Sequence, residues 1–243
     1  MTLTEGVENP LKPPKGARKS WTIYQALKRR IVIGDLTYDS PITEQALACD
    51  FSCSQGTVRE ALLSLQEDGL VDRRGYQGTF VTRTSDEEAT LLVRLRLSIE
   101  CSGMERAVPR ISAEAARKLR AIAELYLACR AERDIFACAE VDRAFHMNIF
   151  KLAEMPMLEP ILKRTLLQLH RFTVSRNRGK ILWRELKEDP HTAIVEAMAR
   201  RDAEQAKTLL AEHIAFSLSR LAPEVHSTIF PQVQSEELNM QLA

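Results

Sequence analysis

The chain has 243 residues, of which 45% are hydrophobic and 28% are charged, and its formal net charge is only +1. This composition excludes intrinsic disorder and fibrous structure, and the length favours two domains that each bury a core. The five cysteines form an odd set without paired CxxC spacing, which argues against a disulfide framework and a cysteine zinc site. No apolar run approaches the ~18 residues of a membrane span and no signal peptide is evident, so we expect a soluble cytoplasmic protein without a membrane partner.

The first third of the chain carries the signals of three helices. Residues 1–17 lack periodicity and are predicted to be a flexible N-terminal arm. Apolar residues then recur at helical spacing over residues 22–34, and a short helix is expected at residues 43–47. A third helix is predicted to begin at Ser54, a good N-cap residue, and to end at Gly69.

Two β-prone runs, residues 70–74 and 78–82, follow this third helix and are separated by Gly75-Tyr76-Gln77. The spacing predicts a two-stranded hairpin, so residues 18–84 have the element order of a winged helix-turn-helix. In such a module the second helix presents its N-terminal residues to the major groove, and its first turn can hold a phosphate. The alternative is a winged helix that serves only as a protein-interaction module. The candidate DNA-binding residues of this helix are Ser54, Gln55, Gly56, Thr57 and Arg59.

A polar stretch at residues 85–90 is predicted to be a linker, and helical periodicity then continues to about residue 225. We therefore expect a mainly α protein, in which the winged helix-turn-helix is followed by an all-α bundle of six or seven helices at residues 91–225. Residues 226–243 lose periodicity and are predicted to be a fraying C-terminal tail. Helix breaks are expected near Pro109, Arg133-Asp134, Met155-Pro156, residues 177–180, Asp189-Pro190 and Asp202.

Three histidines and one aspartate of this bundle can converge. Asp142 and His146 lie four residues apart and so share one helix face. His191 and His213 lie eleven residues on either side of Asp202, where a new helix begins, so an antiparallel helix pair would set them level. One carboxylate and three imidazoles suit zinc, nickel, manganese or iron. The residues alone leave open that these are ordinary hydrogen-bonded or solvent-facing side chains.

Residues 42–81 resemble the winged-helix signature of the GntR family, with Val58-Arg59-Glu60-Ala61-Leu62, Gly69-Leu70-Val71 and Gly78 at the right spacing. The resemblance implies further DNA contacts from Gln77 and Gly78 in the wing. Two family arginines are replaced, by Gln55-Gly56-Thr57 after the capping serine and by Gln77 in the wing, so Arg59 is the only family DNA-contact arginine retained. Because glutamine can pair with adenine, we expect binding with an unusual operator preference and weaker phosphate attraction.

The order Asp142, His146, His191, His213 resembles the FCD effector domain of the FadR subfamily of GntR regulators, in which these positions are metal ligands. The run from Arg96 to Glu100 and the pair Met157-Leu158 are further matches. The resemblance implies a bound divalent metal ion, zinc above the others, and an Arg96 that can face the effector. The alternative for Arg96 is a salt bridge to Glu100. His170 and Arg171 are further candidates for lining the effector pocket.

These features predict a ligand-responsive transcription regulator and not an enzyme. We expect a homodimeric repressor that binds a double-stranded DNA operator and senses a small-molecule carboxylate effector beside the metal. One alternative is a metal-dependent hydrolase, because Asp/His₃ sites can activate water, although no general base is linked to the motif. Another is a regulator whose metal only holds helices together and which has no effector.

Overall fold

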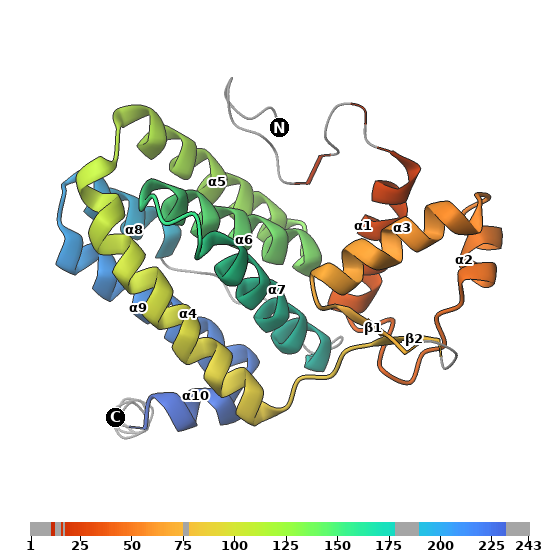
Figure 1. The fold of residues 1–243 in the computed structure, drawn as a ribbon. Coiled ribbons are helices and arrows are strands. Elements are labelled where there is room, and N and C mark those ends of the chain that lie inside the picture. The colour runs from red at the N-terminus through yellow and green to blue at the C-terminus, as the bar shows by residue number, and fades with distance from the viewer. Residues whose placement is uncertain (1–10, 13–15, 17, 75–77, 178–189, 232–243) are drawn as a thin grey trace.

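The computed structural model describes residues 11–12, 16, 18–74, 78–177 and 190–231. Helices α1 (Lys19–Val32), α2 (Glu44–Asp50) and α3 (Gln55–Glu67) come first, and the antiparallel strands β1 (Val71–Arg73) and β2 (Thr79–Val81) follow them. These elements form the winged helix-turn-helix expected from the sequence (Figure 1). The predicted wing tip at residues 75–77 and most of the predicted N-terminal arm lie outside the described residues.

Within the described chain, seven α-helices follow the wing and pack into an all-α bundle (Figure 1). The expected breaks near Pro109, Arg133-Asp134, Met155-Pro156 and Asp202 all separate consecutive helices. The helices are α4 (Asp86–Ala107), α5 (Ala113–Ala131), α6 (Ile135–Leu152), α7 (Glu159–Arg176), α8 (Pro190–Ala199), α9 (Ala203–Leu221) and α10 (Pro223–Ile229), with a 3₁₀ turn at Val108–Arg110.

The stretch predicted as a linker, residues 85–90, is instead helical from Asp86 onwards. The hydroxyl of Ser85 accepts a hydrogen bond from the Glu88 N–H (3.2 Å), and the Glu88 carboxylate accepts one from the Ser85 N–H (2.8 Å), which makes a capping box. The first turn of α4 faces solvent and therefore contains few apolar residues. Its polar sequence was for this reason interpreted as a linker. The extended connection between the domains is therefore residues 82–85.

The C-terminal tail also begins later than residue 226. Helix α10 continues to Ile229, and it buries Val225 and His226 where it packs against α4 and α9. A single short helix offers too few apolar positions for its periodicity to be recognised in the sequence. Residues 232–243 lie outside the described part of the chain.

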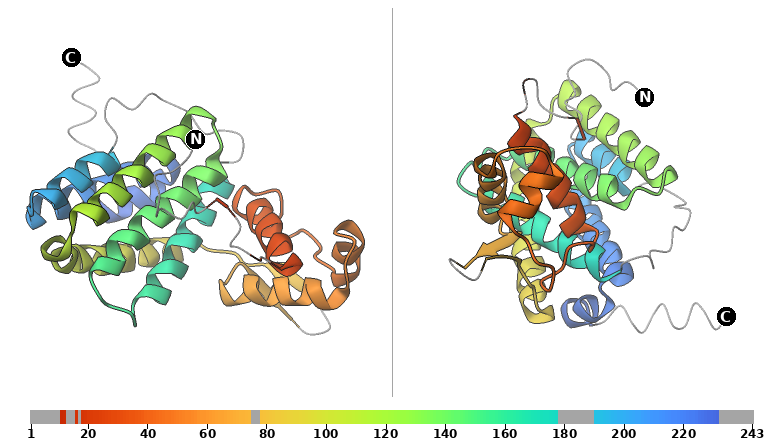
Figure 2. Two further views of the ribbon diagram at one scale, coloured as in Figure 1. Left: turned by 90° about the horizontal axis from the view of Figure 1, so that it is seen from above. Right: turned by 90° about the vertical axis from the view of Figure 1, so that its right-hand side faces the viewer.

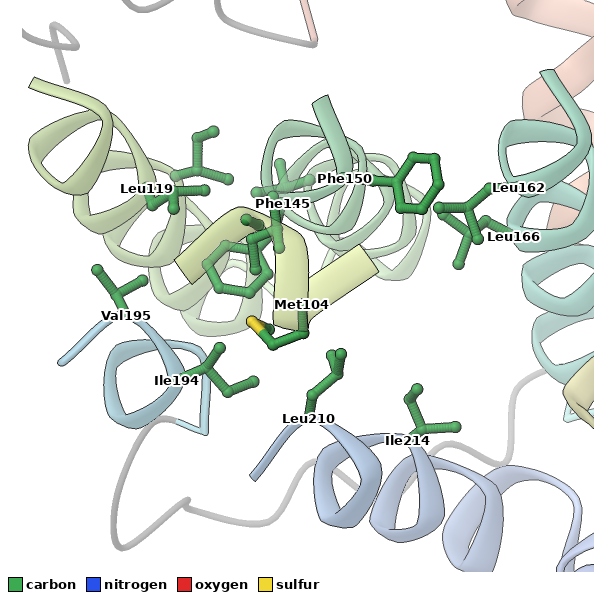
Figure 3. Close-up of a cluster of buried hydrophobic side chains, with 14 of the residues drawn as sticks. Met104, Leu119, Phe145, Phe150, Leu162, Leu166, Ile194, Val195, Leu210 and Ile214 are labelled. Atoms are coloured by element: carbon green, nitrogen blue, oxygen red, sulfur yellow. The ribbon is translucent and has the colours of Figure 1, made fainter. Parts of the chain in front are cut away.

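The bundle is held by one apolar core to which nearly every helix contributes (Figure 3). Gly103 on α4 lets the Phe150 ring of α6 approach the α4 backbone, since a Cβ at position 103 would lie 2.6 Å from Phe150 Cδ2. This close approach brings the two helices that carry much of the site described below next to one another. Core side chains labelled in Figure 3 include Met104, Leu119, Phe145, Phe150, Leu162, Leu166, Ile194, Val195, Leu210 and Ile214.

The substitution Gly103→Ala is expected to destabilise the protein by about 1–3 kcal/mol, because the added methyl group overpacks the α4–α6 contact. For a chain of this length, each kcal/mol of lost stability lowers the melting temperature by roughly 2–4 °C. Gly56→Ala is the matched control, since Gly56 is also helical and an added Cβ would meet only ordinary contacts. Thermal unfolding followed by circular dichroism should separate the two variants, and an equal effect would contradict the packing argument.

The two domains meet at a buried polar contact between α1 and α6. Lys28 Nζ lies 2.6 Å from Glu140 Oε2, and the two residues are only 3% and 4% exposed. The Arg143 guanidinium also binds Glu140, with Nη1 2.7 Å from Oε1. Burial lowers the pKa of Lys28 to about 8, against the pull of the Glu140 carboxylate. The winged helix-turn-helix therefore lies directly against the end of the bundle, as Figure 2 shows from two sides.

Candidate functional site

The N-terminal end of α3 has the shape needed for contact with DNA. The Ser54 hydroxyl caps the helix by accepting a hydrogen bond from the Thr57 N–H (3.2 Å), as the sequence predicted. Gln55 and Arg59 are exposed, Thr57 is half-buried, and Val58 packs into the core beneath them. The first turn of α3 is thus a solvent-facing edge on a rigid support.

Arg59 is held in place by a residue that the sequence analysis did not single out. Glu44, in the first turn of α2, accepts two hydrogen bonds from the Arg59 guanidinium, at 3.2 and 2.7 Å. Glu44 Oε1 also lies 2.8 Å from Arg73 Nη2 on β1. The hydrogen bond from Arg59 is the main cause that lowers the pKa of Glu44. Two arginines and one carboxylate leave a net positive charge on this face.

Of the two wing residues, Gly78 is described and Gln77 is not. Gly78 has φ +100°, a backbone conformation that favours glycine, and its backbone oxygen accepts a hydrogen bond from the Arg74 N–H (2.9 Å). This hydrogen bond joins the residue after β1 to the residue before β2.

The four predicted metal ligands come from three helices and meet in the interior of the bundle. Asp142 Oδ1 lies 3.0 Å from His191 Nε2 and 3.3 Å from His213 Nε2. His146 Nε2 lies 3.5 Å from Asp142 Oδ2 and 3.3 Å from His213 Nε2. One ligand atom of each residue lies within 4.8 Å of those of the other three. The three histidine side chains are at most 4% exposed, and the Asp142 side chain is 12% exposed.

The helix pair α8–α9 brings His191 and His213 together in the way that their spacing predicted. Asp202 caps α9 by accepting a hydrogen bond from the Gln205 N–H (3.0 Å), and Arg201 before it has φ +61°, which reverses the chain direction. The two imidazole rings then lie with their centroids 4.6 Å apart. His191 is fully buried, with its ring edge-on to Tyr126 and Phe145.

The structure contains the salt bridge that was the alternative for Arg96, and it adds a contact with His146. Arg96 Nε donates to Glu100 Oε1 (2.6 Å), which is the salt bridge weighed as an alternative, while Arg96 Nη2 lies 2.8 Å from His146 Nε2. Glu100 Oε2 in turn lies 2.5 Å from His146 Nδ1. The carboxylate therefore accepts the Nδ1 proton of His146 and leaves Nε2 with a lone pair, as in carboxylate–histidine–metal arrangements. Sequence reasoning missed this role of Glu100, because a contact 46 residues apart depends on helix packing.

His170 on α7 joins the same cluster, since its Nε2 lies 3.0 Å from Asp142 Oδ2. Within the described residues, the buried Nδ1 atoms of His170 and His213 have no hydrogen-bond partner. Buried nitrogens without partners carry a desolvation cost, so they point to a group that the protein itself does not provide.

The charge state of the cluster follows from its burial. Burial raises the pKa of Asp142, but the nearby histidines outweigh this effect and hold that pKa well below its usual value. Burial lowers the pKa of His213 to about 4, so this imidazole is neutral near pH 7. Burial also lowers the pKa of His146, but the Glu100 carboxylate more than offsets this and the net direction is upward.

The donor set and its spacing fit a divalent metal ion. Four ligand atoms at about 2.1 Å from one tetrahedral ion lie about 3.4 Å from each other. The Asp142–histidine and histidine–histidine contacts given above span 3.0–3.5 Å. One carboxylate with three buried imidazoles is the borderline-to-hard donor set that zinc and its neighbours favour.

A cavity, partly open to solvent, adjoins this cluster. Arg96, Asp142 and His170 form its polar part, so the two residues predicted to bind an effector and one predicted metal ligand border the same space. The remaining walls come mainly from apolar side chains of α6, α7 and α9.

A winged helix-turn-helix fused to an all-α domain is the architecture of a class of transcription regulators. Residues 19–81 match the family described as "Bacterial regulatory proteins, gntR family", and residues 91–216, slightly more than half of the chain, match the FCD domain. The chain belongs to the GntR family, carries an FCD domain, and is a DNA-binding transcription regulator and not an enzyme.

Named relatives agree with this assignment along most of the chain. The HTH-type transcriptional regulator BphR of Paraburkholderia xenovorans (strain LB400) is 28% identical over 207 residues, covering 81% of this chain and 82% of BphR. The HTH-type transcriptional repressor RspR of Escherichia coli (strain K12) is 24% identical over 212 residues, covering 86% of this chain and 90% of RspR.

The fold is also that of a solved structure, E. coli McbR/YncC, with a TM-score of 0.73 at 20% identity, covering 86% of this chain and 99% of that one. No helix in the described residues combines the length and apolarity that a membrane crossing would require.

Proposed function

We propose that this chain is a ligand-responsive repressor whose FCD domain binds a divalent metal ion, most favourably zinc, through Asp142, His146, His191 and His213. The observation that carries the proposal is the convergence of these four buried side chains, whose ligand atoms all lie within 4.8 Å of one another. When bound, the metal would act as a Lewis acid that attracts an anionic group. Metal analysis of the purified full chain, before and after chelation, tests it directly.

Arg96 links the metal to the effector. Its Nη2 donates to the same His146 nitrogen that would ligate the ion, so metal binding would release this N–H group. The guanidinium would then be available to a carboxylate in the adjacent cavity, which Arg96 lines together with His170. A small carboxylate effector between metal and arginine accounts for a cationic side chain buried to 6% exposure.

A homodimer would set two α3 helices on the two halves of a pseudo-palindromic operator. The exposed first turn of α3, with Gln55, Thr57 and Arg59, would read the bases, and Ser54 with the wing around Gly78 would approach the phosphates. A gel shift with DNA from upstream of the gene, at two salt concentrations, tests specific binding.

Helix α7 is the element that would couple the effector to DNA binding. His170 faces the cavity, while Gln168 and Arg171 on the same helix bind the other domain. Gln168 Nε2 donates to the Asp68 carbonyl at the end of α3 (2.9 Å). Arg171 Nη1 donates to the Thr82 carbonyl in the interdomain connection (2.6 Å). A shift of α7 on effector binding would therefore move the support of the recognition helix.

We expect Arg171→Ala to reduce the effect of an effector on operator affinity. An effector usually changes the affinity for a second ligand by about 5–150-fold. The ratio of operator affinities with and without effector should fall toward one when the interdomain hydrogen bonds are lost. Arg164→Ala is the matched control, because Arg164 also lies on α7 but is exposed and reaches the other domain through a longer hydrogen bond, 3.4 Å to the Glu67 carbonyl. Operator titrations with and without an acid that shifts binding measure the ratio, and an unchanged ratio in the Arg171 variant would contradict α7 coupling.

The alternative of a metal that only holds helices together predicts a different result. Metal would then raise the melting temperature, and a panel of organic acids would add nothing to it. The pocket beside the cluster favours the sensing function over this alternative.

A further inference from the structure

The cavity beside the metal cluster is lined mostly by apolar side chains. Arg96, Asp142 and His170 lie close to one another around His146, whereas Val93, Leu169, Val174 and Leu218 are among the apolar residues that form the walls. Besides Tyr126, the described residues of the lining contribute two hydroxyl groups, those of Thr173 and Ser217. Thr173 Oγ1 already donates within its own helix, lying 2.9 Å from the Leu169 carbonyl oxygen. The walls therefore offer few partners to the hydroxyl groups of a ligand.

A second cavity adjoins the first and shares the side chains of Tyr126, Ile135 and Ser217 with it. Arg130 and Arg220 line this second space, each half-buried and each lying over an aromatic ring, Arg130 at 6.0 Å from the Tyr126 centroid. Its lining also includes the candidate ligand His213. An anion that enters here passes two guanidinium groups before it reaches the metal cluster.

We propose that the effector is an amphiphilic monocarboxylate, with one carboxylate at the Arg96 end and an apolar aliphatic or alicyclic body along the walls, and that it enters past Arg130 and Arg220. This inference rests on the proposed function and specifies the ligand of the same site. Polyhydroxylated acids are disfavoured, because each of their hydroxyl groups would lose water without gaining a partner. Tricarboxylates are disfavoured because their second and third charges would face apolar walls.

Two pairs of acids with identical carbon skeletons test the preference. Hexanoate and gluconate differ only in hydroxyl groups, as do cyclohexanecarboxylate and quinate. Calorimetric titration of the zinc-loaded full chain should give affinities at least about ten-fold higher for the apolar member of each pair. Equal affinities, the reverse order, or no binding by either apolar acid would overturn the inference.

Zinc content, measured on the same samples, separates this result from the proposed function. A protein that binds zinc but prefers gluconate and quinate retains the metal site and refutes the amphiphilic ligand. A protein that binds no zinc refutes the metal part of the proposed function, and the same four titrations without metal still decide the ligand preference.

Two variants locate the ligand within the cavities. Val174→Thr keeps the shape of the wall but places a hydroxyl group there. It should lower the affinity for hexanoate several-fold and leave the zinc content unchanged. Arg220→Gln should slow association of hexanoate and reduce the dependence of that rate on salt. If neither variant alters hexanoate binding while both remain folded by circular dichroism, the acid binds elsewhere and the inference is wrong.

Discussion

The melting temperature of the zinc-loaded protein is expected to be well above that of the metal-free protein. The substitution His191→Ala should remove most of this difference in melting temperature. An ion that binds only the folded state stabilises it by about 4 kcal/mol when its free concentration is 1,000-fold above the Kd. For a chain of this length, each kcal/mol raises the melting temperature by roughly 2–4 °C. The expected increase is therefore large enough to see clearly in a thermal scan. Differential scanning calorimetry of chelated protein, titrated with zinc, measures it.

His191 is the ligand position best suited to this test. Its side chain is fully buried, and its Nε2 lies 3.0 Å from Asp142 Oδ1. His226→Ala is the matched control, because His226 is also buried, at 7% exposure, but lies on α10 outside the cluster. Elemental analysis should find zinc in the control and little in the His191 variant. Equal zinc content in the two would refute the assignment of His191 as a ligand.

Loss of Arg59 should have the second largest effect, a fall in specific operator affinity of about 10- to 100-fold. A bidentate arginine–guanine contact is worth about 1–3 kcal/mol of discrimination, and two other family arginines are already missing from this face. Glu44 orients the Arg59 guanidinium, so the side chain is partly organised before DNA arrives. Fluorescence anisotropy with upstream DNA, at several salt concentrations, measures the change.

Arg117→Ala provides the control for charge alone, since Arg117 is exposed on α5 in the bundle. It removes the same formal charge and should leave operator affinity near that of the unaltered protein. Gln55→Arg restores a basic residue at the start of α3, so it should strengthen binding to any DNA and steepen the salt dependence. If Arg117→Ala weakens binding as much as Arg59→Ala does, the effect is one of overall charge and Arg59 has no special role.

Signals carried by neighbouring residues were sufficient for most of the fold. Ser54 and Asp202 were recognised as helix caps, and the structure shows both accepting the capping hydrogen bond. The helix boundary at Asp202 predicted that α8 and α9 form an antiparallel pair. His191 and His213 are equally far from Asp202, so they were expected to lie level, and both could be named in advance as candidate metal ligands. Caps and periodicity are local, since each depends on residues within one or two turns of helix.

The sequence by itself therefore determined a winged helix-turn-helix, a helical bundle and an Asp/His₃ set with the right spacing. Only the tertiary structure decided that Glu100 orients His146, that Glu44 holds Arg59, and that α7 contacts both the cavity and the recognition helix. These contacts join residues 15 to 100 positions apart, and they form only when packed cores bring the helices together. No local pattern encodes which of many charged side chains will meet, because that choice follows from the packing of the whole domain.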